Sequence, residues 1–283
     1  SWEVDVCGKL KNRKKAAMAR YLSNVEGKNL VVTNLISDIA NAYYELLALD
    51  NELDIVRETV QHRESAFNLV TLQKESAAAN ELMVRQFEAQ FWSSKSLERE
   101  VLQKIIEVEN KINFLLNRFP QDVKRDKSTF YQPLPFKNNM GLPSDLLKNR
   151  PDIRQAEFDL IAAKADVKAA KAAFYPSLNI TGAFGYQAFK TAFLFTTPKS
   201  TAYTLLGTLT APLINRSAIK AEFKTADAMQ QEALFTYQKA ILTGYTEVYN
   251  EMSNIRNLDT IYQYRTNEVT ALSKAIEASS DLF

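Results

Sequence analysis

Glycine and proline are scarce in this chain of 283 residues, which contains 7 glycines and 8 prolines. The share of glycine is about half of what an average soluble domain carries. Since these two residues supply most tight turns and helix breaks, their scarcity predicts long, uninterrupted elements. With 46% hydrophobic and 24% charged residues, the composition is that of a folded protein and excludes a disordered chain.

Cysteine and histidine occur once each, as Cys7 and His62. A single cysteine excludes an internal disulfide and a zinc site built from cysteines alone. A catalytic triad would have to use His62, which falls in a strongly helical stretch and which we interpret as a solvated helix residue. Nucleotide-binding and hydrolase motifs are absent, and the paired carboxylates within residues 98–109 fit solvated helix faces. The sequence therefore predicts no enzyme, no catalytic residue, no metal site and no cofactor.

Charge of one sign is not in excess, because 35 basic residues face 33 acidic ones for a net charge of +2. A nucleic-acid partner is therefore not expected. The sharpest run, at the start of a helical stretch, is Lys9, Lys11, Arg13, Lys14 and Lys15. Positive charge is unfavourable at a helix N-terminus, so we expect an external partner or solvent to compensate it. Anionic lipid headgroups, a merely solvated patch and, with less support, nucleic acid are the alternatives.

No apolar run approaches the roughly 20 residues of a membrane-spanning helix, and no signal peptide is recognisable. Taken alone, these absences favour a cytosolic protein. We reject that interpretation because the chain contains strands of barrel type and because both of its ends fall inside patterned stretches. It begins in a strand-like pattern at residues 2–6 and stops in a helical one at Phe283, so we expect it to be part of a longer protein.

Heptad patterns dominate the first part of the chain. Apolar residues alternate in steps of three and four over four heptads, at Val32, Leu35, Ile39, Ala42, Leu46, Leu49, Leu53, Val56 and Val60. Residues 12–75 contain no proline and one glycine, which predicts a helix of roughly 90 Å. A second seam before Pro120 is formed by Val101, Ile105, Val108, Ile112, Leu115 and Phe119. Between the two helices, residues 76–80 predict a tight helical hairpin.

A third long helix is expected from about Arg216 to the end of the chain. Its apolar face is marked by Tyr245, Val248, Met252, Ile255, Tyr262, Val269, Leu272 and Ile276. Three helices of this length with short joints predict coiled-coil-like packing of helix against helix. The stretch before it differs: residues 120–143 are rich in proline and aperiodic, and we interpret them as a connecting segment. Ser144 fits the N-cap of a short helix.

Pro151 suits the first turn of a further helix, residues 151–174, which carries eight alanines. An alanine surface lets neighbouring backbones approach closely, although alanine is also the best helix former.

The hydrophobic period then changes from 3.5 to 2. Two runs of about 10 to 13 residues alternate apolar side chains with threonine and small residues, a length that crosses a bilayer as a tilted strand. The predicted barrel wall comprises Leu178, Ile180, Phe184, Tyr186, Tyr203, Leu205, Leu209 and Leu213. A soluble antiparallel hairpin with one buried face fits the pattern equally well. In a barrel, a charge such as Leu209→Arg should abolish membrane assembly.

Aromatic residues gather at these strands, namely Phe174, Tyr175, Phe184, Tyr186, Phe189, Phe193 and Phe195. They indicate an aromatic girdle at a membrane interface. Ordinary strand packing is the alternative.

Three segments resemble the outer membrane efflux family, the TolC-like outer membrane factors. Residues 2–10 (WEVDVCGKL) resemble its strand-to-helix junction, where a second aromatic commonly stands in place of Cys7. Residues 141–153 (GLPSDLLKNRPDI) resemble the signature between its two halves, and residues 172–178 (AAFYPSL) the entry into its third barrel strand. The resemblance covers the whole chain and is closest to the branch serving resistance-nodulation-division drug pumps.

The resemblance implies a mainly α fold with a few strands. In this family each protomer of a homotrimer gives four strands to a shared transmembrane β-barrel and long coiled-coil-like helices to a periplasmic tunnel. It implies an outer membrane location in a Gram-negative bacterium, with outer-membrane lipid, a periplasmic adaptor protein and an inner-membrane transporter as partners. The implied adaptor contact is the helical tip, Glu75, Ser76, Ala77, Ala78, Ala79, Asn80 and Glu81. Two positions depart from the family, since Lys74 replaces an aromatic residue and Ala77 replaces a glycine.

We accordingly divide the chain into a strand end (1–7), a tunnel hairpin (8–119), a connecting segment (120–150), an alanine-rich helix (151–175), a barrel hairpin (176–214) and a truncated tunnel helix (215–283). The expected function is a passive exit duct of a tripartite efflux system for drugs and small molecules. The alternatives are the exit duct of a type I protein-secretion system and a soluble coiled-coil scaffold that binds partner helices. Lipidation of the mature N-terminus is left open.

Overall fold

The structure, a computed structural model, describes residues 1–131, 149–212, 214 and 216–280. It is mainly helical with three strands, which confirms the predicted fold class. The described chain forms two units, one of residues 1–30 and 149–280 and the other of residues 31–131. Helix α1 (Lys9–Glu75) contributes to both and, with 67 residues at about 1.5 Å each, is roughly 100 Å long.

In the second unit, α1 pairs with α2 (Glu81–Leu115) along the predicted heptad seams. The buried cluster takes one stripe from each helix, Ala42, Leu46, Leu49, Leu53, Val56 and Val60 against Val101, Ile105, Val108 and Ile112. Burial of these stripes, at about 25 cal/mol per Å² of apolar surface, is the main term that holds the pair together. The seam was predicted to start earlier, but Val32 and Leu35 are exposed. Since α2 stops at Leu115, no described residue of this unit covers them.

Helix α2 also ends before the predicted Phe119, which is exposed. Asn117 adopts a left-handed conformation with φ of 52°. Its backbone N–H donates to the Phe114 carbonyl, and the Arg118 N–H donates to the Asn113 carbonyl at 3.0 Å. These two bonds form a Schellman motif, in which asparagine tolerates the left-handed position better than most residues. The helix therefore stops at this cap, five residues before Pro120.

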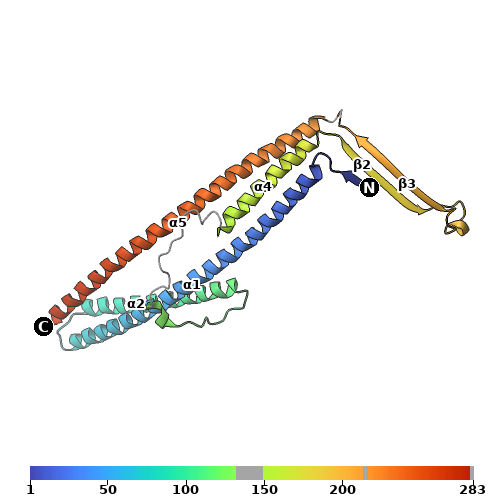
Figure 1. Ribbon diagram of the computed structural model, residues 1–283. Helices are drawn as coiled ribbons and strands as arrows, with labels where there is room; N and C mark the ends of the chain where they lie inside the picture. The colour runs from blue at the N-terminus through green and yellow to red at the C-terminus, as the bar shows by residue number, and fades with distance from the viewer. Residues whose placement is uncertain (132–148, 213, 215, 281–283) are drawn as a thin grey trace. The chain divides into compact units, whose positions relative to one another are not determined.

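In the first unit, α4 (Pro151–Ala172) packs along α5 (Arg216–Ser280) and along the first turns of α1 (Figure 1). Ion pairs join α1 to α4 between Arg20 and Asp166 and, at 2.9 Å, between Arg154 and Glu26. The contact surface is lined by alanines, with Ala16 and Ala19 on α1 and Ala156, Ala162, Ala165, Ala169, Ala170 and Ala172 on α4 all buried. The predicted close approach of backbones over an alanine surface is therefore present.

Most of α5 has no partner within its own unit. The predicted apolar positions at 245, 255, 262, 269, 272 and 276 are exposed, whereas Val248 and Met252 are half-buried. Within this unit these positions are not packed against another helix, so the packing of the third seam stays a prediction. An exposed apolar stripe of this regularity suits a helical partner from outside this unit.

Three antiparallel strands, β1 (Trp2–Val4), β2 (Ser177–Tyr186) and β3 (Thr201–Thr210), form a sheet in the order β1-β2-β3 (Figure 1). The short 3₁₀ helices η1 (Lys127–Tyr131) and η2 (Thr191–Phe193) follow α2 and β2. None of the described helices is long and apolar enough to cross a membrane. The predicted Ser144 N-cap and most of the connecting segment lie outside the described residues.

Candidate functional site

The hairpin of β2 and β3 has two chemically different faces. Directly opposed residues share a face of a sheet, and the register pairs Leu178 with Leu209, Gly182 with Leu205, and Phe184 with Tyr203. Seven of the eight predicted wall residues therefore lie on one face, and Leu213 lies outside the described residues. The other face carries Asn179, Thr181, Thr204, Thr208 and Thr210, with Leu206 as an exception.

The apolar face is not covered by any described residue over most of its length. Tyr203 is 82% exposed and Leu205 is 76% exposed. Only at the β1 side are Leu178 and Ile180 half-buried, where Val4 and Trp2 pair with them. Neither β2 nor β3 carries a charged residue. Such a surface suits lipid or an apolar partner on one side and water on the other, and it is not the buried face of a free-standing soluble hairpin.

The aromatic cluster divides into two groups. Phe184, Tyr186 and Phe195 form edge-on contacts at the far end of the hairpin, with ring centroids 6.4 and 5.7 Å apart. Phe174 instead packs edge-on against Phe223 of α5 at 6.1 Å and is half-buried. The prediction of Phe174 as a girdle residue is therefore not supported, because its ring serves helix packing.

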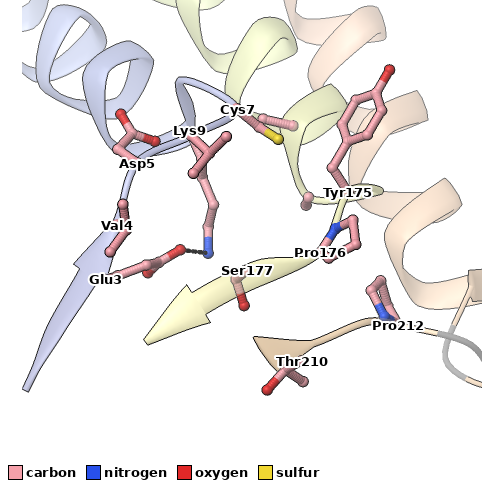
Figure 2. Close-up of a pocket in the computed structure, with 13 residues that line it drawn as sticks. Glu3, Val4, Asp5, Cys7, Lys9, Tyr175, Pro176, Ser177, Thr210 and Pro212 are labelled. Carbon is pink, nitrogen blue, oxygen red and sulfur yellow. Dashed lines mark hydrogen bonds and ion pairs between the residues drawn. The ribbon is translucent and has the colours of Figure 1, made fainter. Parts of the chain in front are cut away.

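The three connections between strands and helices converge at one end of the sheet, around a shallow hollow (Figure 2). Gly8 has φ of 74°, which turns the chain sharply into α1. Both carboxylate oxygens of Asp5 accept backbone N–H bonds, from Leu10 at 3.0 Å and from Lys11 at 2.7 Å. Glu3 accepts a bond from Lys9 Nζ at 3.1 Å (Figure 2).

These contacts correct the interpretation of the basic run. The sequence predicted an external partner or solvent as compensation for positive charge at the N-terminus of α1. The structure places two carboxylates of the chain there, Glu3 and Asp5, so the first backbone N–H groups of α1 and the Lys9 ammonium are compensated internally. The remaining lysines of the run, at 11, 14 and 15, form no ion pair with a described residue. The two carboxylates were visible in the sequence as Glu3-Val4-Asp5. Their position beside the start of α1 depends on the turn at Gly8, which the sequence did not show.

The Arg150-Pro151-Asp152 part of the family-like signature forms a clamp between α4 and α5. Arg150 binds both Asp152 oxygens, at 3.0 and 2.7 Å, and Glu247 of α5 at 2.6 Å. The Arg150 guanidinium holds the pKa of the Asp152 carboxyl below its usual range. Gly244 lies beneath this clamp, and a Cβ there would approach Arg150 Nε to 3.1 Å and Ile153 Cδ1 to 3.3 Å.

Gly244→Leu is expected to destabilise the packing of α4 on α5 by about 2 kcal/mol. The added side chain must displace an arginine held by two carboxylates and a buried isoleucine. Urea unfolding followed by circular dichroism measures the change. Gly27→Leu is the matched control, since the three atoms nearest to a Cβ there all belong to the end of the flexible Gln155 side chain. Equal losses at both glycines would contradict the role of the clamp.

The predicted tip, residues 75–81, is a compact capped turn between α1 and α2. Ala77 adopts the left-handed conformation with φ of 58°, and the Ala78 N–H donates to the Gln73 carbonyl at 2.8 Å. The Asn80 side chain caps α2 by accepting the Met83 N–H at 2.9 Å. Lys74 forms an ion pair with Glu81 across the turn and lowers the pKa of the Glu81 carboxyl. Of the two residues that differ from the family pattern, Lys74 therefore forms the ion pair and Ala77 adopts the left-handed conformation.

Ala77→Gly is expected to stabilise the hairpin by about 1 kcal/mol. The left-handed conformation is less favourable for a non-glycine residue by roughly 1–2 kcal/mol. Part of this gain is lost on substitution, because glycine gives the unfolded chain more conformational freedom. The midpoint of urea unfolding should rise. Ala78→Gly, at a position without positive φ, is the control and should lower it. A lower midpoint for Ala77→Gly would contradict the assigned backbone strain.

One buried polar cluster had no signal in the sequence. Arg125 binds Asp50 through Nη2 at 2.9 Å, and it also binds Glu109 and, at 3.0 Å, the Val123 carbonyl. Asp50 is buried, and 75 residues separate it from Arg125. Beside this cluster, buried Asn113 donates to the Gln121 carbonyl at 2.7 Å. Together these contacts fasten the segment after α2 onto the helix pair.

In the described ranges, no three histidine, cysteine, aspartate or glutamate side chains are close enough to hold a metal ion. Cys7 is exposed at the sheet end, and His62 is exposed on α1.

Comparison with known proteins agrees with this architecture. A relative is the pyoverdine export outer membrane protein OpmQ of Pseudomonas aeruginosa, 29% identical over 287 residues, which covers 100% of this chain and 59% of that protein. The open-state MtrE outer membrane channel of Neisseria gonorrhoeae superposes with a TM-score of 0.83 at 26% identity, over 93% of this chain and 59% of the channel. A CusC structure gives a TM-score of 0.87 at 24% identity, over 99% of this chain and 65% of that one.

The chain thus spans about three-fifths of the length of these proteins. The family model described as outer membrane efflux protein matches residues 1–118 and 142–283, which is most of the chain. The match includes the junction, the clamp and the hairpin described above. This chain belongs to the outer membrane efflux protein family.

Proposed function

We propose that this chain forms part of a homotrimeric exit duct that conducts drugs and other small molecules passively across the outer membrane. As a member of its family, it is a protein of the Gram-negative outer membrane, with its helical part in the periplasm. The observation that carries the proposal is the hairpin of β2 and β3. Its uncharged strands present an exposed apolar face and a threonine-lined face, as the wall of a water-filled barrel requires.

The assembly into a homotrimer is supported by the uncovered stripe of α5. A helix of 65 residues with exposed Ile255, Leu272 and Ile276 needs a helical partner, and a neighbouring protomer or a further helix supplies one. The same argument applies to the sheet, because a three-stranded sheet with exposed edges must pair further to cross a membrane.

The tip at residues 75–81 is the proposed contact for a periplasmic adaptor protein, which links the duct to an inner-membrane transporter. It is exposed apart from half-buried Ala79, and its shape is set by the caps at Ala77 and Asn80. The inner-membrane transporter supplies the energy, and the duct supplies a polar conduit. No catalytic role is proposed.

The two alternatives are separated by particular observations. A soluble coiled-coil scaffold has no use for Tyr203 and Leu205 in solvent, so the hairpin argues against it. A type I protein-secretion duct would share the whole architecture. The relative OpmQ is described as an export protein for pyoverdine, which favours small molecules as cargo.

Single-channel recording tests the proposal. The protein that carries this chain, purified from outer membranes, is reconstituted into a planar bilayer. Discrete, stable openings are expected. The family resemblance implies that the helical tips close the tunnel until the transporter and adaptor open it, so openings should become more frequent when the tip is loosened by Asn80→Ala, which removes the α2 cap. Correctly assembled protein that stays silent in both forms would refute the duct.

A further inference from the structure

Three helix ends meet at the same edge of the sheet. In the register, Val4 pairs with Leu178 and Ser177 pairs with Thr210, so these rows mark one end of all three strands. Helix α1 begins at Lys9, α4 ends at Ala172 and α5 begins at Arg216, each within a few residues of that end. Figure 2 shows residues of all three connections around one hollow. Charged side chains at these three helix ends therefore lie near one another, at the same end of the sheet.

The start of α1 carries positive charge without acidic neighbours along the helix. No aspartate or glutamate occurs between Lys9 and Val25. Lys9 is held by Glu3, and Arg13 lines a crevice that also holds Asp166 and Glu222. The side chains of Lys11, Lys14 and Lys15 are exposed and form no ion pair with any described residue.

The other two helix ends add to this charge. Lys171 is exposed in the last turn of α4, and no acidic residue follows Asp166 in that helix. On α5, Lys220 and Lys224 are exposed, and Glu222 is the one carboxylate among the first eleven residues. We call the six lysines 11, 14, 15, 171, 220 and 224 the basic collar. The sequence showed one basic run without a companion, whereas the fold brings lysines of three helices together.

The basic collar lies directly beyond the apolar face of the hairpin. That face ends at Leu178 and Leu209, and the collar lysines lie within the first or last nine residues of their helices, at most about 15 Å along the axis. Strands β2 and β3 carry no charged residue, and the basic residues Lys190 and Lys199 are in the loop at the opposite end of the hairpin. An uncharged band bordered by lysines is the distribution expected of a surface that meets a bilayer and its headgroups.

We infer that the basic collar binds the phosphodiester headgroups of anionic phospholipids in the periplasmic leaflet of the outer membrane. Lysine is a flexible point charge, so six of them on three helices form a diffuse electrostatic surface rather than a shaped pocket. Such a surface selects for negative charge and not for the structure of the headgroup, and it weakens with salt. The inference rests on the proposed placement of the hairpin in the membrane.

Lipid titration of the purified protein in neutral detergent tests the inference. Phosphatidylglycerol and phosphatidylcholine of equal chain length are added, and bound lipid is counted by native mass spectrometry. The unsubstituted protein should bind phosphatidylglycerol about tenfold more tightly than phosphatidylcholine. The collar variant, Lys14→Gln with Lys171→Gln and Lys220→Gln, removes one charge from each helix and should lose this preference.

The matched control is Lys28→Gln with Lys239→Gln and Lys274→Gln. It removes the same charge from exposed positions of α1 and α5 away from the sheet, and should keep the preference. Three outcomes overturn the inference: equal phosphatidylglycerol binding by the collar variant, binding of inorganic phosphate as tight as that of the lipid, or loss of adaptor co-purification with unchanged lipid binding. The last would assign the collar to a protein contact.

Channel recording separates this inference from the proposed function. The collar variant should still open in a planar bilayer, because none of its three substitutions touches the strands. Openings with no lipid preference in the unsubstituted protein would overturn the collar and leave the duct intact. A preference for phosphatidylglycerol in a protein that shows no openings would overturn the duct and leave the collar intact.

Discussion

Leu205→Arg is expected to prevent assembly of the protein in the outer membrane. Leu205 pairs with Gly182 in the middle rows of a hairpin whose ten paired residues run from Ser177 to Tyr186, and its side chain lies on the apolar face. An arginine at the midplane of a transmembrane barrel destabilises the folded barrel by about 2–4 kcal/mol per chain, and in a trimer this destabilisation occurs in each of the three chains. The result is measured as loss of the folded protein from outer membrane fractions.

Depth and face provide two matched controls for this substitution. Thr204→Arg introduces the same side chain one residue away on the polar face and should assemble normally, because charges in a water-filled lumen stay hydrated. Leu209→Arg lies on the apolar face but in the last rows before the helices, where the cost falls to about 0–1 kcal/mol. The register therefore leads us to expect a smaller effect at Leu209 than at Leu205. Normal assembly of Leu205→Arg, or failure of Thr204→Arg alone, would contradict the assignment of the faces.

Arg125→Ala is expected to destabilise the helical hairpin of α1 and α2 by about 3–5 kcal/mol. Arg125 is the shared partner of Asp50 and Glu109, and Asp50 is only 4% exposed. Without the guanidinium, two carboxylates remain close together in a desolvated place with no compensating charge. The segment after α2 also loses the bond to the Val123 carbonyl. The free energy of unfolding in urea, followed by circular dichroism, should fall by this amount.

Lys127→Ala is the control for the loss of one positive charge in the same segment. Lys127 pairs with Asp54 at 2.7 Å, but both side chains are about half exposed, so its removal should cost less than 1 kcal/mol. Asp50→Asn added to Arg125→Ala should recover part of the loss, because it removes the uncompensated charge. A cost for Arg125→Ala no larger than for Lys127→Ala would show that the cluster is solvated rather than buried.

The periodic elements of this protein were predictable from the sequence because a period records the geometry of one element. Steps of three and four predicted the α1 and α2 seams, whose members from Ala42 to Val60 and from Val101 to Ile112 are buried. Alternation placed seven of the predicted wall residues on one face before any register was known. Prediction failed at the ends of these patterns, at Val32 and Phe119, since a pattern does not show where a partner helix stops.

Contacts between distant residues were decided by the tertiary structure alone. Arg125 and Asp50 are 75 residues apart, and Arg150 and Glu247 are 97 apart. No local pattern marks such pairs, because their free energy depends on how whole helices pack. The basic collar is the clearest case for function. The sequence determined long helices, alternating strands and the family, whereas the sheet register brought lysines of three separate helices to one end of an uncharged hairpin.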